Sequence, residues 1–130
     1  MRVEEWEKWR KEGLFPIILD GGQATEFERQ GADLSVGSLW SARLIKDAPA
    51  SVRSVARSYL EADADIVSSV TYQATLEGLA SNLSVSEDDA ETLLRKGVTL
   101  VVTERDRFWN DVGLKARGRK RKPLVAGSIG

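Results

Sequence analysis

Short apolar runs, each followed by turn-forming or polar residues, recur along the chain and predict its strands. Residues 14–19 (LFPIIL) precede residues 20–22 (DGG), residues 66–70 (IVSSV) precede residues 71–73 (TYQ), and a further run, 124–128 (LVAGS), lies near the C-terminus. Apolar runs of this length are typical of strands that are buried on both faces, as in a parallel sheet. We therefore expect three strands.

Two segments with helical periodicity separate these runs. The first is expected to begin with Asp47 as its N-cap and with Pro49 in its first turn, where proline is accepted. Its apolar stripe is made of Val52, Val55, Ala56, Tyr59 and Leu60. The second is expected to begin at a capping box formed by Ser86 and Asp89 and to continue for about 25 residues. Its apolar face is made of Ala90, Leu93, Leu94, Val98, Val101, Arg105, Phe108 and Val112.

Shorter helices are expected at 3–12 and 23–30, with Gly13 and Gly31 as the stops, because glycine readily adopts the left-handed conformation that closes helices. The stretch 32–46 is expected to be irregular. The resulting order of strand, helix, strand, helix, strand predicts an α/β fold with a parallel sheet and right-handed crossovers. In such folds the carboxyl ends of the strands lie at one edge, which is where sites are built.

Composition and charge narrow the class of protein. Of the 130 residues, 42% are hydrophobic and 30% are charged, which is the balance of a single ordered, soluble domain. The net charge of −1 gives no general attraction to nucleic acid or to an acidic membrane. No apolar run is long enough to span a bilayer. The start of the chain, MRVEE, is acidic and lacks the apolar stretch of a signal peptide, so a cytoplasmic location is expected.

The chain contains no cysteine and no histidine. This excludes disulfides, metal sites built from thiolates or imidazoles, and nucleophile schemes that use cysteine or a serine–histidine pair. Any chemistry that these residues perform alone depends on carboxylates, hydroxyls, amides, lysine, arginine or the backbone.

Five segments, in order along the chain, resemble the homocysteine S-methyltransferase family. They are 18–26 (ILDGGQATE), 31–34 (GADL), 39–43 (LWSAR), 71–75 (TYQAT) and 125–130 (VAGSIG). A single Asp-Gly-Gly would be weak evidence, because it occurs in many turns, but five blocks in the same order are specific. One departure is Asp63, where relatives usually carry glycine. If that turn needs a positive φ, aspartate tolerates it better than most residues do.

The resemblance implies the N-terminal part, about three βα units, of a (β/α)8 barrel, a fold that typically needs about 250 residues. This resemblance begins at about residue 14 and implies a partial homocysteine-binding domain at 14–130 that is truncated at its C-terminus. The helix expected at 3–12 then makes residues 1–13 an N-terminal helical extension. Family members transfer a methyl group from a sulfonium or similar donor to the sulfur of homocysteine, which is bound as a thiolate to a zinc ion held by cysteines. The expected partners are thus homocysteine and a methyl donor, with zinc as the implied cofactor. Because this chain has no zinc ligand, we expect it to be inactive by itself, and the alternative is a non-catalytic amino-acid-binding or interaction module.

The resemblance also suggests substrate-binding residues. Asp20 would pair with the ammonium group of the amino acid, and Gly21 and Gly22 would allow close approach of the backbone. The alternative is that these three residues only form a turn that ends the strand. Thr71, Tyr72 and Gln73 would line the same pocket, or else form a polar strand end.

Three further features remain, two of which have both a functional and a structural interpretation. Glu26 would hydrogen-bond a neighbouring loop or lie on the exposed face of its helix, and Trp40 is expected to anchor the irregular stretch. Residues 115–122 carry six positive charges in eight positions, which suggests a nuclear-localisation or nucleic-acid patch. The alternative is a solvated loop, which is favoured because no aromatic residue interrupts the charges.

Overall fold

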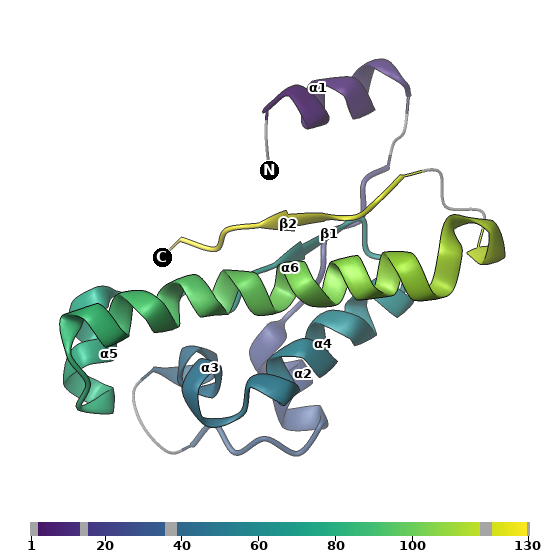
Figure 1. The fold of residues 1–130 in the computed structure, drawn as a ribbon. Helices are drawn as coiled ribbons and strands as arrows, with labels where there is room; N and C mark the ends of the chain where they lie inside the picture. Colours follow the sequence, from purple (N-terminus) through teal and green to yellow (C-terminus); the bar gives the residue numbers. More distant parts are fainter. Residues whose placement is uncertain (1–2, 14–15, 36–38, 118–120, 130) are drawn as a thin grey trace.

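The computed structural model describes residues 3–13, 16–35, 39–117 and 121–129, with the side chains at 6, 40, 41 and 112–117 outside the description. Helices dominate an α/β arrangement (Figure 1). The elements are α1 (Val3–Lys11), α2 (Gln23–Arg29), the 3-10 helix η1 (Trp40–Arg43), α3 (Leu44–Asp47), α4 (Pro49–Glu61), β1 (Ile66–Ser68), α5 (Leu76–Leu83), α6 (Glu87–Arg117) and β2 (Leu124–Ala126).

The two strands are parallel, as the alternation of elements predicts. In their register Ile66 lies opposite Leu124, and Ser68 lies opposite Ala126. A third segment joins the other edge of β1 through a parallel bridge between Leu19 and Ile66, and the Asp20 amide donates to the Ile66 carbonyl at 2.9 Å. Three parallel segments therefore lie side by side in chain order.

The strand predicted at 14–19 is reduced to that single bridge within the part of the chain that the structure describes, and residues 14–15 lie outside it. The Ile18 amide donates to the Asp65 carboxylate at 2.9 Å instead of to a strand carbonyl. Proline at position 16 has no N–H to contribute to a ladder. The expectation of three complete strands in about three βα units is therefore not confirmed.

The two faces of the sheet carry different clusters, as the alternation of side chains along a strand requires. Val67 on β1 packs into the main core with Leu60 of α4 and with Phe108 of α6. Ile66 and Leu124 instead pack with Trp9 of α1. In Figure 1, α4 and α6 lie on one side of the strands and α1 on the other.

The apolar stripe of α4 is confirmed, because Val52, Val55, Ala56 and Leu60 are buried. The start of the helix was predicted wrongly. Asp47 is the last residue of α3, where its carboxylate accepts from Arg43 Nε at 2.9 Å, and the residue that precedes α4 is Ala48. Pro49 occupies the first turn as expected.

Helix α6 is longer than predicted, at 31 residues. Its expected N-cap is confirmed, since the Asp89 amide donates to Ser86 Oγ at 3.1 Å. On its apolar face Ala90, Val101 and Phe108 are buried, while Val98 keeps 37% of its surface exposed. The side chain of Val112, also predicted on that face, lies outside the described residues.

The region expected to be irregular contains η1 and α3, and α5 was not predicted at all. The N-cap of α5 is Thr75, whose side chain accepts from the Gly78 amide at 3.0 Å, and its C-cap is Ser84, which has a φ of 51°. Asp63 has a φ of 70°, so this turn does need the positive φ that was considered for it. Within the described ranges, no helix is both long and apolar enough to cross a membrane.

Candidate substrate-binding edge of the sheet

The carboxylate of Asp20 is tied to the end of β1. Its Oδ2 accepts from the Ser68 amide at 2.7 Å, and its Oδ1 accepts from the Ser68 hydroxyl at 2.9 Å. The side-chain Nε2 of Gln23 also donates to the Ser68 carbonyl, at 2.6 Å. A carboxylate has about four acceptor positions, so two remain for a ligand. Asp20 is partly exposed and is therefore held in place while still accessible.

Gly21 and Gly22 form the loop between this carboxylate and α2. Gly22 precedes the first residue of α2 in an extended conformation, and both glycines are exposed. The hydroxyl of Tyr59, on α4, donates to the Gly22 carbonyl at 3.0 Å. The sequence placed Tyr59 only in an apolar stripe. Its contact with the loop was missed, because periodicity says nothing about where the polar tip of a tyrosine lies.

Glu26 lies one turn into α2 and makes mainly local contacts. Its carboxylate accepts from Arg29 Nε and Nη2, both at 2.7 Å, and from Gln30 at 2.8 Å. The Ser58 hydroxyl on α4 also donates to it, at 3.1 Å. These donors, Arg29 foremost, lower the pKa of Glu26 to about 2. Glu26 is therefore ionised and links α2 to α4. Neither role considered for it is found, because its long-range partner lies on a helix rather than a loop and its side chain is only 14% exposed.

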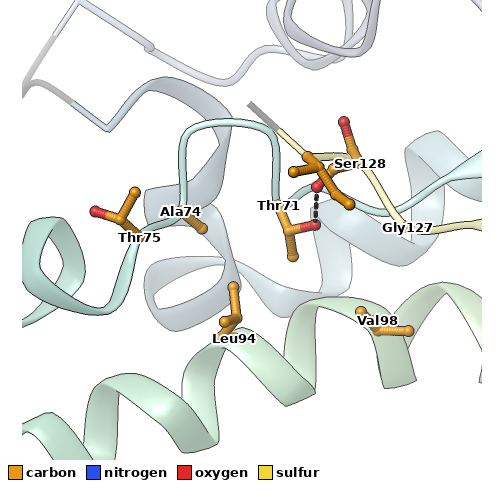
Figure 2. A pocket seen from close by; sticks show the side chains of 8 residues that line it. Thr71, Ala74, Thr75, Leu94, Val98, Gly127 and Ser128 are labelled. Carbon is orange, nitrogen blue, oxygen red and sulfur yellow. Dashed lines mark hydrogen bonds between the residues drawn. The ribbon is translucent and has the colours of Figure 1, made fainter.

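Thr71 is buried in a closed ring of hydrogen bonds beyond the end of β1. Its hydroxyl donates to the Ser128 carbonyl at 2.9 Å (dashed in Figure 2), and the Ser128 amide donates to Ser69 Oγ at 2.9 Å. Because the Thr71 hydrogen is used in this way, the 2.7 Å contact between Ser69 and Thr71 must use the Ser69 hydroxyl as donor. The ring locks the segment after β1 to the segment after β2.

The structure does not bring Tyr72 and Gln73 into this ring. Tyr72 keeps 59% of its surface exposed, and Gln73 is exposed as well. An open cavity of about 400 Å³ lies between Thr71, Ser128 and the α6 residues Leu94 and Val98 (Figure 2). Its lining does not include Asp20, Gly21 or Gly22. The six predicted substrate residues thus fall into separate groups, one around Asp20 and one around Thr71.

The described residues do not form a metal site. The described part of the chain contains no group of three or more acidic, histidine or cysteine side chains that could hold an ion. With no cysteine or histidine in the sequence, the donor set does not fit a thiolate-bound zinc.

Two members of the basic run have structural partners. Arg121 pairs with Asp65 at 3.1 Å and lies over the Trp9 ring, 4.3 Å from its centroid. Lys122 pairs with Asp106 at 2.6 Å. This contact, together with the one from Arg105, lowers the pKa of Asp106. Residues 118–120 and the side chains of 115–117 lie outside the described residues, as does the Trp40 side chain that was expected to be an anchor.

Comparison with known proteins decides the family. The model of the homocysteine S-methyltransferase family matches residues 17–130. The chain belongs to this family. It is 41% identical over 118 residues to homocysteine S-methyltransferase 2 of Arabidopsis thaliana, which covers 87% of this chain and 35% of that protein. It is 43% identical over 116 residues to the selenocysteine Se-methyltransferase of Brassica oleracea var. italica, covering 87% of this chain and 33% of the relative.

Solved structures of the homocysteine methyltransferase MmuM from Escherichia coli are also similar. The oxidized form has a TM-score of 0.74 at 34% identity, and the metallated form has a TM-score of 0.73 at 35% identity. Both matches cover 88% of this chain, with 37% and 38% of the respective MmuM chains. This homocysteine S-methyltransferase family member thus spans about a third of the length of the relatives it matches.

Proposed function

We propose that this chain supplies the amino-acid-binding edge of a homocysteine S-methyltransferase, which moves a methyl group from a sulfonium or similar donor to the sulfur of homocysteine and forms methionine. The observation that carries the proposal is the Asp20 carboxylate, held by Ser68 at the carboxyl edge of three parallel segments with acceptor positions to spare. Family membership and relatives named for this reaction support it.

The finer fold belongs to the same proposal. We take residues 14–130 as the first βα units of a (β/α)8 barrel, preceded by a helical extension at 1–13. The chain order of the parallel segments, with Leu19, Ile66 and Leu124 in one register, supports this arrangement. In a barrel the carboxyl ends of all strands face a common site. This would bring the Asp20 group and the Thr71 group to the same mouth.

The proposed roles follow from the chemistry of an amino acid. Asp20 accepts hydrogen bonds from the substrate ammonium, while the exposed backbone at Gly21 and Gly22 approaches its polar head. Thr71, Tyr72 and Gln73 contribute hydroxyl and amide groups at the rim. Because Thr71 already uses its hydroxyl within the ring, its part is to fix the rim, and the exposed Tyr72 and Gln73 are the members accessible to a ligand.

Zinc, which the family resemblance implies, finds no thiolate or imidazole in these 130 residues, so none of them is assigned to it. The substrate sulfur therefore has no proposed partner in this chain. We further propose a cytoplasmic location, since the free thiol of homocysteine persists in a reducing compartment.

Calorimetric titration of the protein with homocysteine tests this proposal. If Asp20 recognises the ammonium group, homocysteine and homoserine bind with similar affinity, while N-acetylhomocysteine, which has no ammonium, does not bind. Absence of homocysteine binding at millimolar concentration contradicts the substrate assignment. A parallel assay with S-adenosylmethionine measures methyl transfer. Because the chain has no thiolate or imidazole to hold zinc, we expect binding without transfer, and transfer by this chain alone would contradict that expectation.

A further inference from the structure

Tyr59 connects α4 to the loop that carries Asp20. Its hydroxyl donates to the Gly22 carbonyl at 3.0 Å, and the same carbonyl accepts the first helical bond of α2 from the Glu26 amide at 3.1 Å. A Cβ placed on Gly21 would lie 3.2 Å from the Tyr59 hydroxyl oxygen and 3.4 Å from its ring carbon Cε1. The tyrosine thus covers the backbone of the loop at two consecutive residues.

We propose that Tyr59 is a positioning residue, which holds the Asp20-Gly21-Gly22 loop in the geometry that receives the amino-acid head of the substrate. This inference rests on the proposed function. The loop is fastened at two points, since Ser68 holds the Asp20 carboxylate and Tyr59 holds the backbone two residues later. A loop fixed at both points loses less conformational freedom when a ligand binds, and the ligand then binds more tightly.

The surroundings of Tyr59 favour this role across the ordinary pH range. Burial of the ring raises the pKa of its hydroxyl, and the negative charges of Glu26 and Asp20 raise it further. The hydroxyl therefore keeps its hydrogen and remains a donor to Gly22. A tyrosine hydroxyl has a single hydrogen, and here it is used in the bond to the Gly22 carbonyl.

The same contact gives Gly21 a second reason to be glycine. From sequence alone, its missing side chain leaves room for the substrate. In the structure, a methyl group at position 21 would press on the Tyr59 hydroxyl at 3.2 Å, closer than an ordinary contact. A movement of the hydroxyl away from position 21 would change its 3.0 Å bond to the Gly22 carbonyl. The two explanations predict different behaviour when Tyr59 is changed.

The first test is Tyr59→Phe, which removes the hydroxyl and keeps the ring. We expect the dissociation constant for homocysteine to rise by about three- to tenfold, the effect of one hydrogen bond. Ser81→Ala is the control, because it removes an exposed hydroxyl that donates to the Glu77 carbonyl of the same helix, α5, and it should leave affinity unchanged. If the wild type binds homocysteine and Tyr59→Phe binds equally well, the inference is overturned while the proposed function stands.

The second test is a double-mutant cycle with Gly21→Ala. If Tyr59 restrains position 21, Gly21→Ala weakens binding less in the Tyr59→Phe background than in the wild type. Equal losses in both backgrounds would assign Gly21 to the substrate alone and contradict the inference.

Hydrogen exchange of peptides covering residues 20–26 separates the loop effect from the binding effect. We expect about tenfold faster exchange in Tyr59→Phe, with the global unfolding midpoint little changed. If the wild type does not bind homocysteine, the proposed function fails and the substrate part of this inference fails with it. The exchange data then still decide whether Tyr59 orders the loop, and unchanged exchange rejects that as well.

Discussion

Arg121 binds both carboxylate oxygens of Asp65 at the amino end of the strands, with Nε 3.2 Å from Oδ1 and Nη2 3.1 Å from Oδ2. Asp65 also accepts from the Ile18 amide, and Arg121 stacks on Trp9 of α1. This ion pair and its neighbours therefore connect four parts of the chain: the start of β1, the segment before β2, the segment at Ile18 that pairs with β1, and helix α1. The pair lies at the amino ends of the strands, whereas the Asp20 loop lies at their carboxyl ends. A change in this ion pair should therefore leave the loop undisturbed.

Arg121→Ala should destabilise the protein without altering the Asp20 edge. Its side chain and that of Asp65 are only 16% and 17% exposed, so breaking the pair costs more than breaking a surface pair, and we expect about 2 kcal/mol in urea unfolding. Arg95→Ala is the control, because Arg95 is 77% exposed in a pair within α6 and should cost less than about 0.5 kcal/mol. Equal effects of the two variants would contradict a special role for the Asp65–Arg121 pair.

Asp20→Asn should weaken homocysteine binding while leaving the fold nearly as stable as before. The asparagine can accept from the Ser68 amide with its oxygen and donate to the Ser68 hydroxyl with its nitrogen, so both contacts survive in altered form. The lost negative charge removes a charge-assisted bond to the ammonium, which we expect to raise the dissociation constant roughly tenfold or more.

Asp20→Ala is the comparison that separates binding from folding. It removes the contacts with Ser68 as well, so we expect a loss of about 1–2 kcal/mol in unfolding free energy in addition to weaker binding. If Asp20→Asn retains the affinity of the wild type, as measured by calorimetry, the carboxylate acts only as a structural tie to β1.

Gly97→Ala should destabilise the packing of α6, although alanine is the better helix former. A Cβ at Gly97 would lie 2.7 Å from Cδ1 of Ile45 and 3.0 Å from Cγ2 of Thr71. Ile45 is fully buried and Thr71 is held in its ring of hydrogen bonds, so neither can easily retreat. Overpacking of about 1–3 kcal/mol outweighs a helix-propensity gain of about 1 kcal/mol.

Thr99→Ala, at an exposed position of the same helix, serves as the control for Gly97→Ala. It should change the unfolding free energy by no more than about 0.5 kcal/mol. If Gly97→Ala proves more stable than the wild type in urea unfolding, the contact with Ile45 and Thr71 is looser than these distances indicate.

The sequence predicted the parts of the fold that depend on local pattern. The stripe on α4, the Ser86 cap and the parallel pairing of β1 with β2 all follow from periodicity and turn chemistry. Helix α5 could have been found, since Thr75 is a suitable N-cap before apolar residues at helical spacing. With only 8 residues, however, it offers two turns of periodicity, a much weaker signal than the stripes of α4 and α6.

The candidate site was predicted less completely, because its contacts are between residues far apart in sequence. Asp20 was identified through the family resemblance, but its partner Ser68 lies 48 positions away, and Tyr59 lies 37 positions from Gly22. Likewise the first strand was overestimated, since nothing in 14–19 shows that the Ile18 amide turns to the Asp65 side chain. Such contacts become visible only when the chain is folded.

Glu26 should make stability depend on acid in a defined pH window. Its pKa is lowered to about 2 in the folded state from an ordinary value of 4.5, chiefly by Arg29. The folded state therefore favours the ionised carboxylate, and this contribution is fully present above pH 4.5 and is lost as the pH falls toward 2. Glu26→Gln should thus be less stable than the wild type at pH 7, with the difference shrinking between pH 4.5 and 2.5 in urea titrations. A difference that stays constant across this range would mean that Glu26 holds α2 to α4 by hydrogen bonding alone, without the charge that Arg29 stabilises.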